Sequence, residues 1–489
     1  MGASRQADLY FASFTLPDFL NYLLAAGALS IVFIPIFLKY IEAGEPQRGW
    51  RAFSVIANFI LVVGAVGIVL MMVFARPLAA IVAPGFSDPA EVETLVRLMR
   101  IILPAQFFHV LGGLLAAALM AQDRHALPAI APLVYSAGII GGGLVGAAHP
   151  EIGAEGFAWG VLVGSILGPM RRYPAFSWRS EDLRRYLVLS LPIMLGFSIV
   201  VVDEWIVKNQ ASYLAAGALS YLQYGRTLMK VPIGVFGMAT GVASYPTVSR
   251  MVAAGDVVEA YRVLARAVRL MLVAILAAQV CLTIAGFEAV YVVWGLFSSR
   301  FTVADAEATA GVLVFLSLGL GGWAAQTVIG RGFYALGATW LPTLVGSAIT
   351  VALIPLYVLL RQYHGADGLA VASSIAILVY VFLLGYLQRR RFDREARDRG
   401  TSLAGVPGML SATWRLAVAA AVAIALGLAI RQGLVALLPG IDAASILLRG
   451  SLLCAAGIAI YAAVAQLLGV RELGDLAALL TRRLRRRRG

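Results

Sequence analysis

Long runs of apolar residues, interrupted by Pro, Gly and single polar positions, recur along the whole chain. A helix needs about 20 apolar residues to cross the hydrocarbon core of a bilayer. On this criterion the runs predict about 13 membrane-spanning helices. Their limits are 8–40, 52–80, 95–121, 126–148, 153–171, 184–209, 216–250, 264–290, 308–333, 340–361, 366–388, 412–434 and 445–469. The longest polar stretch between them, 389–408, is only a loop, so no soluble domain is expected.

The composition supports this pattern. Of the 489 residues, 61% are hydrophobic and only 13% are charged, whereas soluble domains carry about 25% charged residues. The predicted fold class is therefore an all-α integral membrane protein. Several spans are broken by Pro and polar residues, which lipid does not tolerate unless they face protein or a water-filled cavity. A transporter fits such spans better than a simple membrane anchor.

The net charge of +13 is distributed over alternate loops. This is the positive-inside pattern, which places the C-terminus in the cytoplasm and, with an odd number of spans, the N-terminus outside. We interpret the basic tail as an anchor to anionic lipids and expect no nucleic-acid partner. The basic residues concentrate in segments 39–51, 171–185, 250–269, 389–399 and 482–488.

An internal repeat is visible at an offset of 211 residues, where segment 35–44 resembles segment 246–255. Both begin with a Pro and end with a Gly. A second echo, between 120–128 and 334–342, has an offset of 214 residues. Because the offset covers six spans, both copies run in the same direction through the membrane. The repeat predicts two parallel, pseudo-symmetric helical lobes around a central cavity, followed by two C-terminal helices.

Ionisable side chains inside spans are costly, at about 2.5–3.5 kcal/mol each, and are functional candidates by default. In the sixth predicted span, Glu204 and Lys208 are four residues apart and can form an ion pair on one helix face. Asp203 lies about 100° further around the helix and needs a cation from another span.

The seventh span carries Gln223, Arg226 and Lys230, spaced three and four residues apart on one face. A guanidinium and an ammonium on one inward face suit a phosphate or pyrophosphate. The alternative is that Arg226 pairs with Asp203 and only holds two helices together. Pro232 and the glycine that follows it should loosen this helix.

The first span adds Asp18 and Asn21, which share a helix face, and Asp8, whose position also fits the outer membrane interface. No nucleophile elbow, phosphate-binding loop or metal-ligand spacing is present, so we expect neither enzymatic activity nor a cofactor. The two cysteines, Cys281 and Cys454, lie inside apolar spans and are interpreted as small buried apolar residues.

Several short motifs resemble those of the MurJ/MviN family, the bacterial flippases of the peptidoglycan precursor lipid II, within the multidrug/oligosaccharidyl-lipid/polysaccharide exporter superfamily. Taken together they are fairly specific and cover most of the chain. The matching stretches are Leu16-Pro17-Asp18, Gly27-Ala28-Leu29-Ser30 with Pro35, Ala83-Pro84-Gly85-Phe86, Pro232-Ile233-Gly234-Val235-Phe236-Gly237 and Arg331-Gly332-Phe333-Tyr334-Ala335.

The resemblance implies a family fold of 14 spans, with two six-helix lobes around a cationic cavity and two extra helices linked to binding the lipid tail. It also implies transport of an undecaprenyl-pyrophosphate-linked substrate between the leaflets of the cytoplasmic membrane by alternating access. On this reading the lobes are 1–172 and 173–400, and 401–489 holds the two extra spans and the basic tail. The chain begins at the family's second span, from which we expect a start codon assigned too late rather than an incomplete lobe.

The chain departs from the family in its charged positions. Asn21 stands where the family has an arginine, and Arg226-Thr227 stands where the family has Asp-Arg, which moves the arginine by one position. Membrane lipids and a coupling ion or the membrane potential are further expected partners. The candidate substrate-binding residues are Arg226, Lys230, Asn21, Asp18, Asp8, Thr227 and Asp203.

Four alternatives stay open at this level. The first is a flippase for another polyprenyl-linked glycan, such as an O-antigen or exopolysaccharide unit. The second is an ion-coupled exporter of cationic drugs, which predicts a net acidic cavity. An integral-membrane transferase would need a catalytic pair in a large polar loop. A homologue that does not transport is the fourth.

Overall fold

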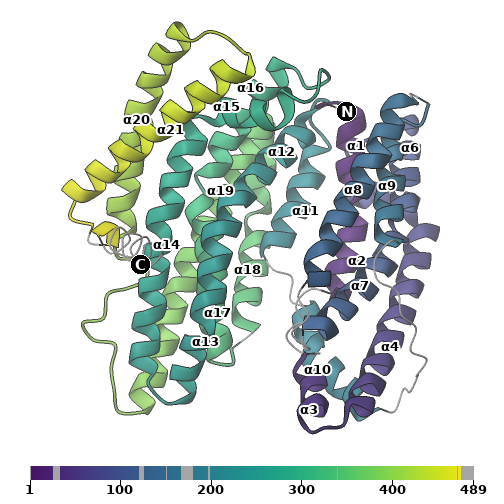
Figure 1. Ribbon diagram of the computed structural model, residues 1–489, viewed down its shortest axis with the longest axis vertical. Helices are drawn as coiled ribbons and strands as arrows, with labels where there is room; N and C mark the ends of the chain where they lie inside the picture. The colour runs from purple at the N-terminus through teal and green to yellow at the C-terminus, as the bar shows by residue number, and fades with distance from the viewer. Residues whose placement is uncertain are drawn as a thin grey trace. The chain divides into compact units, whose positions relative to one another are not determined.

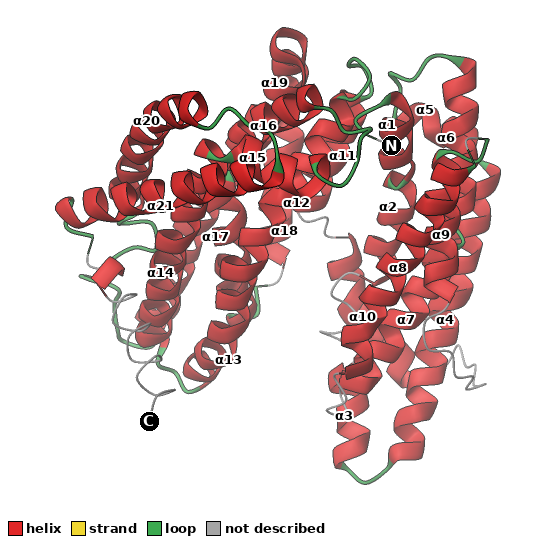
Figure 2. Cartoon of the chain, turned by 45° about the horizontal axis from the view of Figure 1, so that its top comes forward, coloured by secondary structure: helices red, strands yellow, loops and turns green. Residues whose placement is uncertain are grey.

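The computed structural model describes residues 2–25, 34–120, 126–149, 151–166, 180–195, 199–338, 340–470 and 472–474. Every regular element in these ranges is a helix (Figure 2), which confirms the predicted all-α class. Predicted features outside the described residues include the motif Gly27–Ser30, residues 171–179 of the basic segment 171–185, and the basic tail from residue 482 onward.

The chain divides into two compact units, Ala3–Leu219 (unit 1) and Ser220–Gly489 (unit 2), each described here by itself. The helices of unit 1 (Figure 1) are α1 (Arg5–Ser13), α2 (Thr15–Ala25), α3 (Ile34–Glu42), α4 (Pro46–Val73), α5 (Ala75–Val82), α6 (Pro89–Ile102), α7 (Ala105–Met120), α8 (Ala126–Ala148), α9 (Ala154–Ile166), α10 (Glu181–Leu195) and α11 (Ile199–Ala211).

Helix α12 (Ala218–Pro232) begins at the division, and all but its first two residues belong to unit 2. The π-helix η2 (Ile233–Met238) continues it. The further elements are α13 (Ala239–Ala253), α14 (Val257–Ile284), α15 (Gly286–Val290), η3 (Tyr291–Gly295), α16 (Val303–Ser317), α17 (Leu320–Ala335), α18 (Trp340–Ala352), α19 (Ile354–Asp398), α20 (Thr413–Leu437) and α21 (Ala443–Leu467). Helices α20 and α21 form a pair that packs on α14 (Figure 1).

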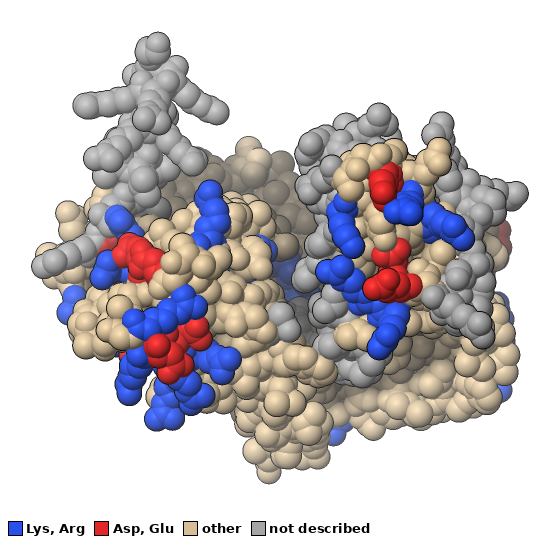
Figure 3. Space-filling model, turned by 90° about the horizontal axis from the view of Figure 1, so that it is seen from below, with Lys and Arg blue, Asp and Glu red and all other residues tan. Residues whose placement is uncertain are grey.

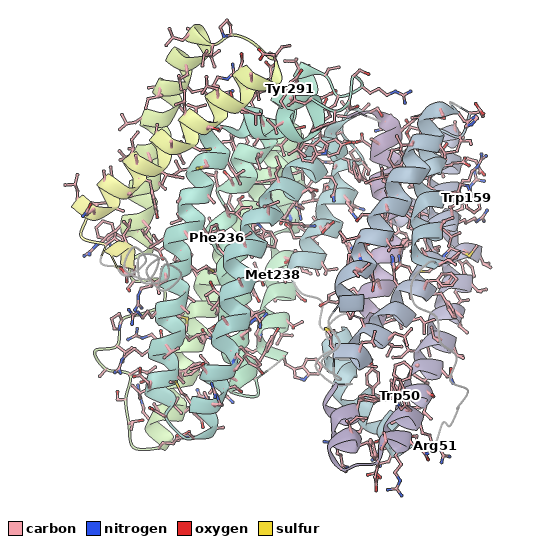
Figure 4. All side chains as sticks on the ribbon, viewed as in Figure 1. Trp50, Arg51, Trp159, Phe236, Met238 and Tyr291 are labelled. Carbon is pink, nitrogen blue, oxygen red and sulfur yellow. The ribbon has the colours of Figure 1, made fainter. Side chains whose placement is uncertain are left out.

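Within the described residues, eight helical segments are long and apolar enough to cross a bilayer, or nine if the bent pair α16–α17 is counted as one span. The count of 13 therefore stays a prediction. Helix α19 is broken at Gly365, which has a φ of 54°. This residue lies between the predicted spans 340–361 and 366–388. Large apolar side chains are exposed on both units, including Trp159, Phe236 and Met238 (Figure 4), as expected for surfaces that face lipid.

The internal repeat is confirmed in the helix boundaries. Adding 211 to the bounds of α4 gives the bounds of α14, and both helices have 28 residues. Adding 214 to the first residue of α6 gives the first residue of α16. The residue before each of these two helices, Asp88 and Thr302, is a side-chain N-cap. The helices α4 and α6 thus have counterparts at the repeat offset in unit 2.

The turns that lead into α4 and α14 also match, bond for bond. Gly44 and Gly255, 211 positions apart, have φ of 74° and 89°, a left-handed conformation that favours glycine. The amide that follows each glycine donates back to a carbonyl five residues earlier, at 2.9 Å in both copies. This is the Schellman motif, and it explains why the repeat ends on a glycine.

A glycine seam holds α8 against α9. Three glycines at every fourth position of α8 face three on α9, so that the two backbones touch. A Cβ added to Gly142 would lie 2.2 Å from the carbonyl oxygen of Gly156. By contrast, a Cβ on the neighbouring Gly141 would meet no atom within 4 Å.

Helices α10 and α11 belong to unit 1, where α10 contacts α2 and α4 and α11 contacts α5. The sequence-based lobe boundary at 172/173 assigned these helices to the second lobe. The two units are defined by contacts within the structure, whereas the lobes were inferred from the sequence. The lobe boundaries therefore stay a prediction.

Charged side chains gather at helix ends. Figure 3 shows Lys and Arg side chains concentrated over the end in view, with Asp and Glu among them. Trp50 and Arg51 mark this end of α4 (Figure 4). Exposed ion pairs at such connections include Arg48–Glu45 at 2.8 Å and Arg399–Glu395 at 3.0 Å. Exposed pairs of this kind contribute little to stability, about 0–1 kcal/mol each.

Candidate functional site

A buried lysine forms the centre of the polar cluster in unit 1. The Lys208 ammonium lies 3.6 Å from the Glu204 carboxylate, which confirms the predicted pair within α11. It also lies 3.3 Å from the Asp18 carboxylate on α2. The lysine side chain is only 6% exposed, whereas that of Asp18 is 47% exposed. Two carboxylates therefore share one buried cation, an arrangement that the sequence did not reveal.

Two further candidates lie close to this cluster along the chain. Asn21 is on α2, one turn from Asp18, and is half-buried. Asp203 is on α11 and fully buried. Asp203 belongs to unit 1 and Arg226 to unit 2, so the predicted pairing of these two residues stays a prediction.

Asp8, the remaining candidate in unit 1, is engaged with the backbone. Its carboxylate accepts a 2.7 Å hydrogen bond from the amide of Gly217, and the side chain is buried. Gly217 has a φ of 91°, so it belongs to the tight connection between α11 and α12. In this structure Asp8 fastens that connection to α1. A contact with substrate is not needed to explain its burial.

The same connection explains the motif Ala83-Pro84-Gly85-Phe86. The Gly85 amide donates to the Ser212 hydroxyl at 3.0 Å, and a Cβ on Gly85 would lie 2.3 Å from the Ser212 backbone. The guanidinium of Arg5 lies 4.5 Å from the Phe86 ring and makes two hydrogen bonds to Glu91, at 2.7 and 3.0 Å. This end of unit 1 is therefore a latch that joins α1, α6 and the residues after α11.

In unit 2, the Arg226 guanidinium is buried, 4% exposed, and donates to the Ser373 hydroxyl of α19 at 3.5 Å. Lys230 lies one turn further along α12 and is exposed. Thr227 is also exposed, and its hydroxyl donates to the Gln223 carbonyl within the helix at 2.8 Å. Of the polar face predicted on α12, only Arg226 is fully buried.

The loosened helix predicted after Pro232 is present. Directly after this proline, the chain forms the π-helix η2 before α13 begins. A π-helix widens the backbone turn and is common at functional sites. Arg226 and Lys230 thus lie in the two turns before a change of helix type. Guanidinium and ammonium groups form strong, charge-assisted hydrogen bonds with phosphate oxygens.

One buried ion pair was not recognised from the sequence. Glu288 of α15 accepts a 2.7 Å hydrogen bond from Arg449 of α21, and both side chains are less than 5% exposed. Arg431 of α20 lies 3.9 Å from the second carboxylate oxygen. The available signal was the presence of arginines inside the last two predicted spans, Arg415 and Arg431 in one and Arg449 in the other.

His109 of α7 is paired with a side chain of α9. Its ring nitrogen lies 3.0 Å from the Ser165 hydroxyl. Among the described residues, no group of His, Cys, Asp and Glu has the arrangement of a metal site. The polar residues described above form one charge cluster around Lys208 and one buried ion pair between Glu288 and Arg449.

A family model described as lipid II flippase MurJ matches residues 1–441. The chain belongs to the MurJ family. Among its relatives, a probable lipid II flippase MurJ of Vibrio cholerae is 26% identical over 98% of this chain and 92% of the relative. A second, of Rhizobium tropici, is 27% identical over 77% of this chain and 73% of the relative. The resemblance drawn from the motifs is confirmed.

Solved structures support the same fold. A structure of the lipid II flippase MurJ in an inward closed conformation matches with a TM-score of 0.72 and 19% identity, covering 95% of this chain and 93% of that chain. An inward-facing multidrug resistance MATE family transporter of the MOP superfamily matches with a TM-score of 0.68 and 15% identity, over 81% and 92%. At these identities the likeness is one of fold.

Proposed function

We propose that this chain is a transporter that moves lipid II, a peptidoglycan precursor carried on undecaprenyl pyrophosphate, from the inner to the outer leaflet of the bacterial cytoplasmic membrane. Membership of the MurJ family over residues 1–441 and the names of its relatives support this function. The helical transporter fold is consistent with alternating access. Transport then depends on an ion gradient or the membrane potential.

The observation that carries the mechanism is Arg226. A guanidinium that is 96% removed from solvent is costly to keep in an apolar helix unless it serves binding or packing. Lys230, one turn away, supplies a second cation that is exposed. In our proposal the pyrophosphate is held by these two side chains, because guanidinium and ammonium groups form strong, charge-assisted hydrogen bonds with phosphate oxygens.

The other candidate residues receive different roles. Asp18 and Asn21 are proposed to contact the sugar or peptide part of the substrate, since Asp18 is half exposed beside Lys208. Asp203 is proposed to adjust the net charge around Asp18 and Lys208. Thr227 is proposed as a minor polar contact, and Asp8 as part of the latch that positions α12.

The test is complementation of a bacterial strain in which the resident lipid II flippase is depleted. We expect this chain to restore growth and the appearance of lipid II in the outer leaflet. Arg226→Gln should lower the transport rate roughly 10–100-fold, the effect of losing one charge-assisted hydrogen bond. Arg226→Lys should retain part of the activity, because the charge stays while the planar fork is lost.

The matched control is Arg415→Gln, which removes an exposed arginine that lies over the Trp414 ring on α20. Protein amount and thermal stability in membranes are measured for each variant, since Arg226 is buried. Full activity of Arg226→Gln would refute the pyrophosphate contact. Failure of the unaltered, membrane-inserted chain to restore growth would refute lipid II as substrate and direct attention to other polyprenyl-linked glycans.

The proposed orientation places the C-terminus in the cytoplasm, as the distribution of basic loops indicates. A fluorescent protein that folds only in the cytoplasm, fused to the C-terminus, should therefore fluoresce. A dark fusion that is nevertheless full-length would contradict the orientation.

A further inference from the structure

Unit 2 contains a cavity of about 530 Å³ where α14, α15 and α16 meet the pair α20–α21. Its inner wall includes Thr283 and Phe287, both buried. Its rim includes Val435 and Ile441, which are 38% and 50% exposed. The cavity thus has a buried floor and an open, apolar edge beside the connection between α20 and α21.

The floor carries a closed ion pair. Arg449 lines the cavity and is bonded through its Nε atom to Glu288 at 2.7 Å and through a second nitrogen to the Leu438 carbonyl at 2.8 Å. This pair is electrically neutral and its hydrogen bonds are directed at protein atoms. It shapes the floor and adds little free charge to the cavity.

A second arginine is left with unused hydrogen-bonding capacity. Arg431 also lines the cavity, and its Nε is 3.9 Å from the other Glu288 oxygen, too far for a hydrogen bond. Both atoms are buried and have no hydrogen-bond partner. Buried polar atoms in native proteins are usually satisfied. The Arg431 side chain as a whole is 33% exposed and lines the cavity, so its guanidinium can donate hydrogen bonds to an acceptor that enters there.

The cavity wall also carries a carboxylate. Glu307 of α16 lines the same cavity and is exposed at its edge, with no ion-pair partner among the described residues. Because Glu288 and Arg449 neutralise each other, the charges that remain available are one guanidinium and one carboxylate. A ligand that complements this wall carries one negative and one positive group.

The surroundings indicate where such a ligand comes from. The outer faces of α20 and α21 near the cavity expose large apolar side chains, among them Leu437 at 78%, Leu447 at 51% and Leu448 at 50%. Both helices are apolar enough to cross a membrane. Exposed apolar side chains on helices of this kind are typical of a surface that borders lipid. A ligand anchored in the bilayer can enter by this edge.

We propose that this cavity binds the headgroup of a zwitterionic phospholipid with a free ammonium group, such as phosphatidylethanolamine. Arg431 donates to the phosphate, and Glu307 accepts hydrogen bonds from the ammonium. The acyl chains leave over Val435 and Ile441. Bound in this way, the lipid fills the space between the pair α20–α21 and the core of unit 2. None of the candidate substrate-binding residues named from the sequence lines this cavity.

The experiment is native mass spectrometry of the full-length protein in detergent, titrated with phosphatidylethanolamine, phosphatidylcholine or phosphatidylglycerol of identical acyl chains. We expect the unaltered protein to bind phosphatidylethanolamine roughly tenfold more tightly than the other two lipids. The trimethylated ammonium of phosphatidylcholine has no N–H donors, and the glycerol headgroup of phosphatidylglycerol carries no positive charge. Glu307→Gln should abolish this preference. Arg431→Gln should weaken all three lipids.

Two controls separate the site from general effects of charge. Arg415→Gln removes an exposed arginine near the other end of the same helix, α20, and Glu93→Gln removes an exposed carboxylate of unit 1. Neither should change lipid binding. The proposal is overturned if the three lipids bind equally to the unaltered protein, or if Glu307→Gln and Arg431→Gln bind as the controls do. Both test residues lie at least partly in solvent, so these variants are expected to fold.

Discussion

The buried ion pair between Glu288 and Arg449 gives the sharpest prediction on stability. It connects α15 to α21, and therefore the last two helices to the rest of unit 2. The perturbation is Arg449→Met, which keeps the length and apolar character of the side chain and removes the charge. It leaves the Glu288 carboxylate, 2% exposed, without its hydrogen-bonded partner.

Removing one partner of a buried pair usually costs about 3–5 kcal/mol, because the remaining charge stays buried without compensation. Here Arg431, 3.9 Å from Glu288, can turn toward the carboxylate and reduce the loss. We therefore expect a value near the lower limit, about 3 kcal/mol. On the scale of globular domains of 150–250 residues, this corresponds to a fall in Tm of about 6–12 °C.

The assay is thermal unfolding of the purified protein in detergent, followed by tryptophan fluorescence. The double variant Glu288→Met/Arg449→Met supplies the decisive comparison. Replacing both charges by apolar groups of similar size is often neutral or stabilising, so this variant should recover most of the lost Tm. If Arg449→Met alone is too unstable to purify, recovery of yield in the double variant reports the same coupling.

Additive effects of the two substitutions on the Tm would refute this reasoning. If Glu288→Met/Arg449→Met loses as much Tm as the two single variants together, the two groups do not interact in the way that their 2.7 Å distance implies. A Tm unchanged by Arg449→Met would also contradict it.

Three further predictions follow from other contacts. Gly142→Leu should destabilise unit 1 by about 1–3 kcal/mol or more, because the added side chain forces α8 away from α9. Gly141→Leu is the control: a Cβ added at Gly141 meets no atom within 4 Å, so this variant should not lower the Tm. Asp18→Asn and Glu204→Gln should each be tolerated, but the double variant should lose more stability than the two single variants together, since Lys208 then has neither carboxylate. Additive losses of stability would count against a cation shared by the two carboxylates. Hydrogen bonds from Ser445 hold the pKa of the Asp442 carboxyl below its usual range, so this N-cap of α21 stabilises the fold at neutral pH and loses its effect as the pH falls through that pKa. The Tm difference between the unaltered protein and Asp442→Ala should therefore disappear in acid, and a difference that persists would contradict this role.

The sequence by itself determined the class of fold, the family and the repeat. Hydrophobic run length reports directly on membrane spans, and glycine at 44 and 255 reports on a turn geometry that other residues rarely adopt. The pair Glu204–Lys208 was predictable for the same reason, because residues four apart on a helix are neighbours wherever the helix lies.

Only the tertiary structure decided which distant polar groups meet. Asp18 and Lys208 are 190 positions apart, Asp8 and Gly217 are 209 apart, and Glu288 and Arg449 are 161 apart. Such contacts depend on how helices pack and rotate about their axes, which hydrophobic periodicity does not specify when a helix is apolar on most sides. Asp8 illustrates this point, because hydrophobic periodicity does not predict that its carboxylate accepts a hydrogen bond from a turn 209 positions away.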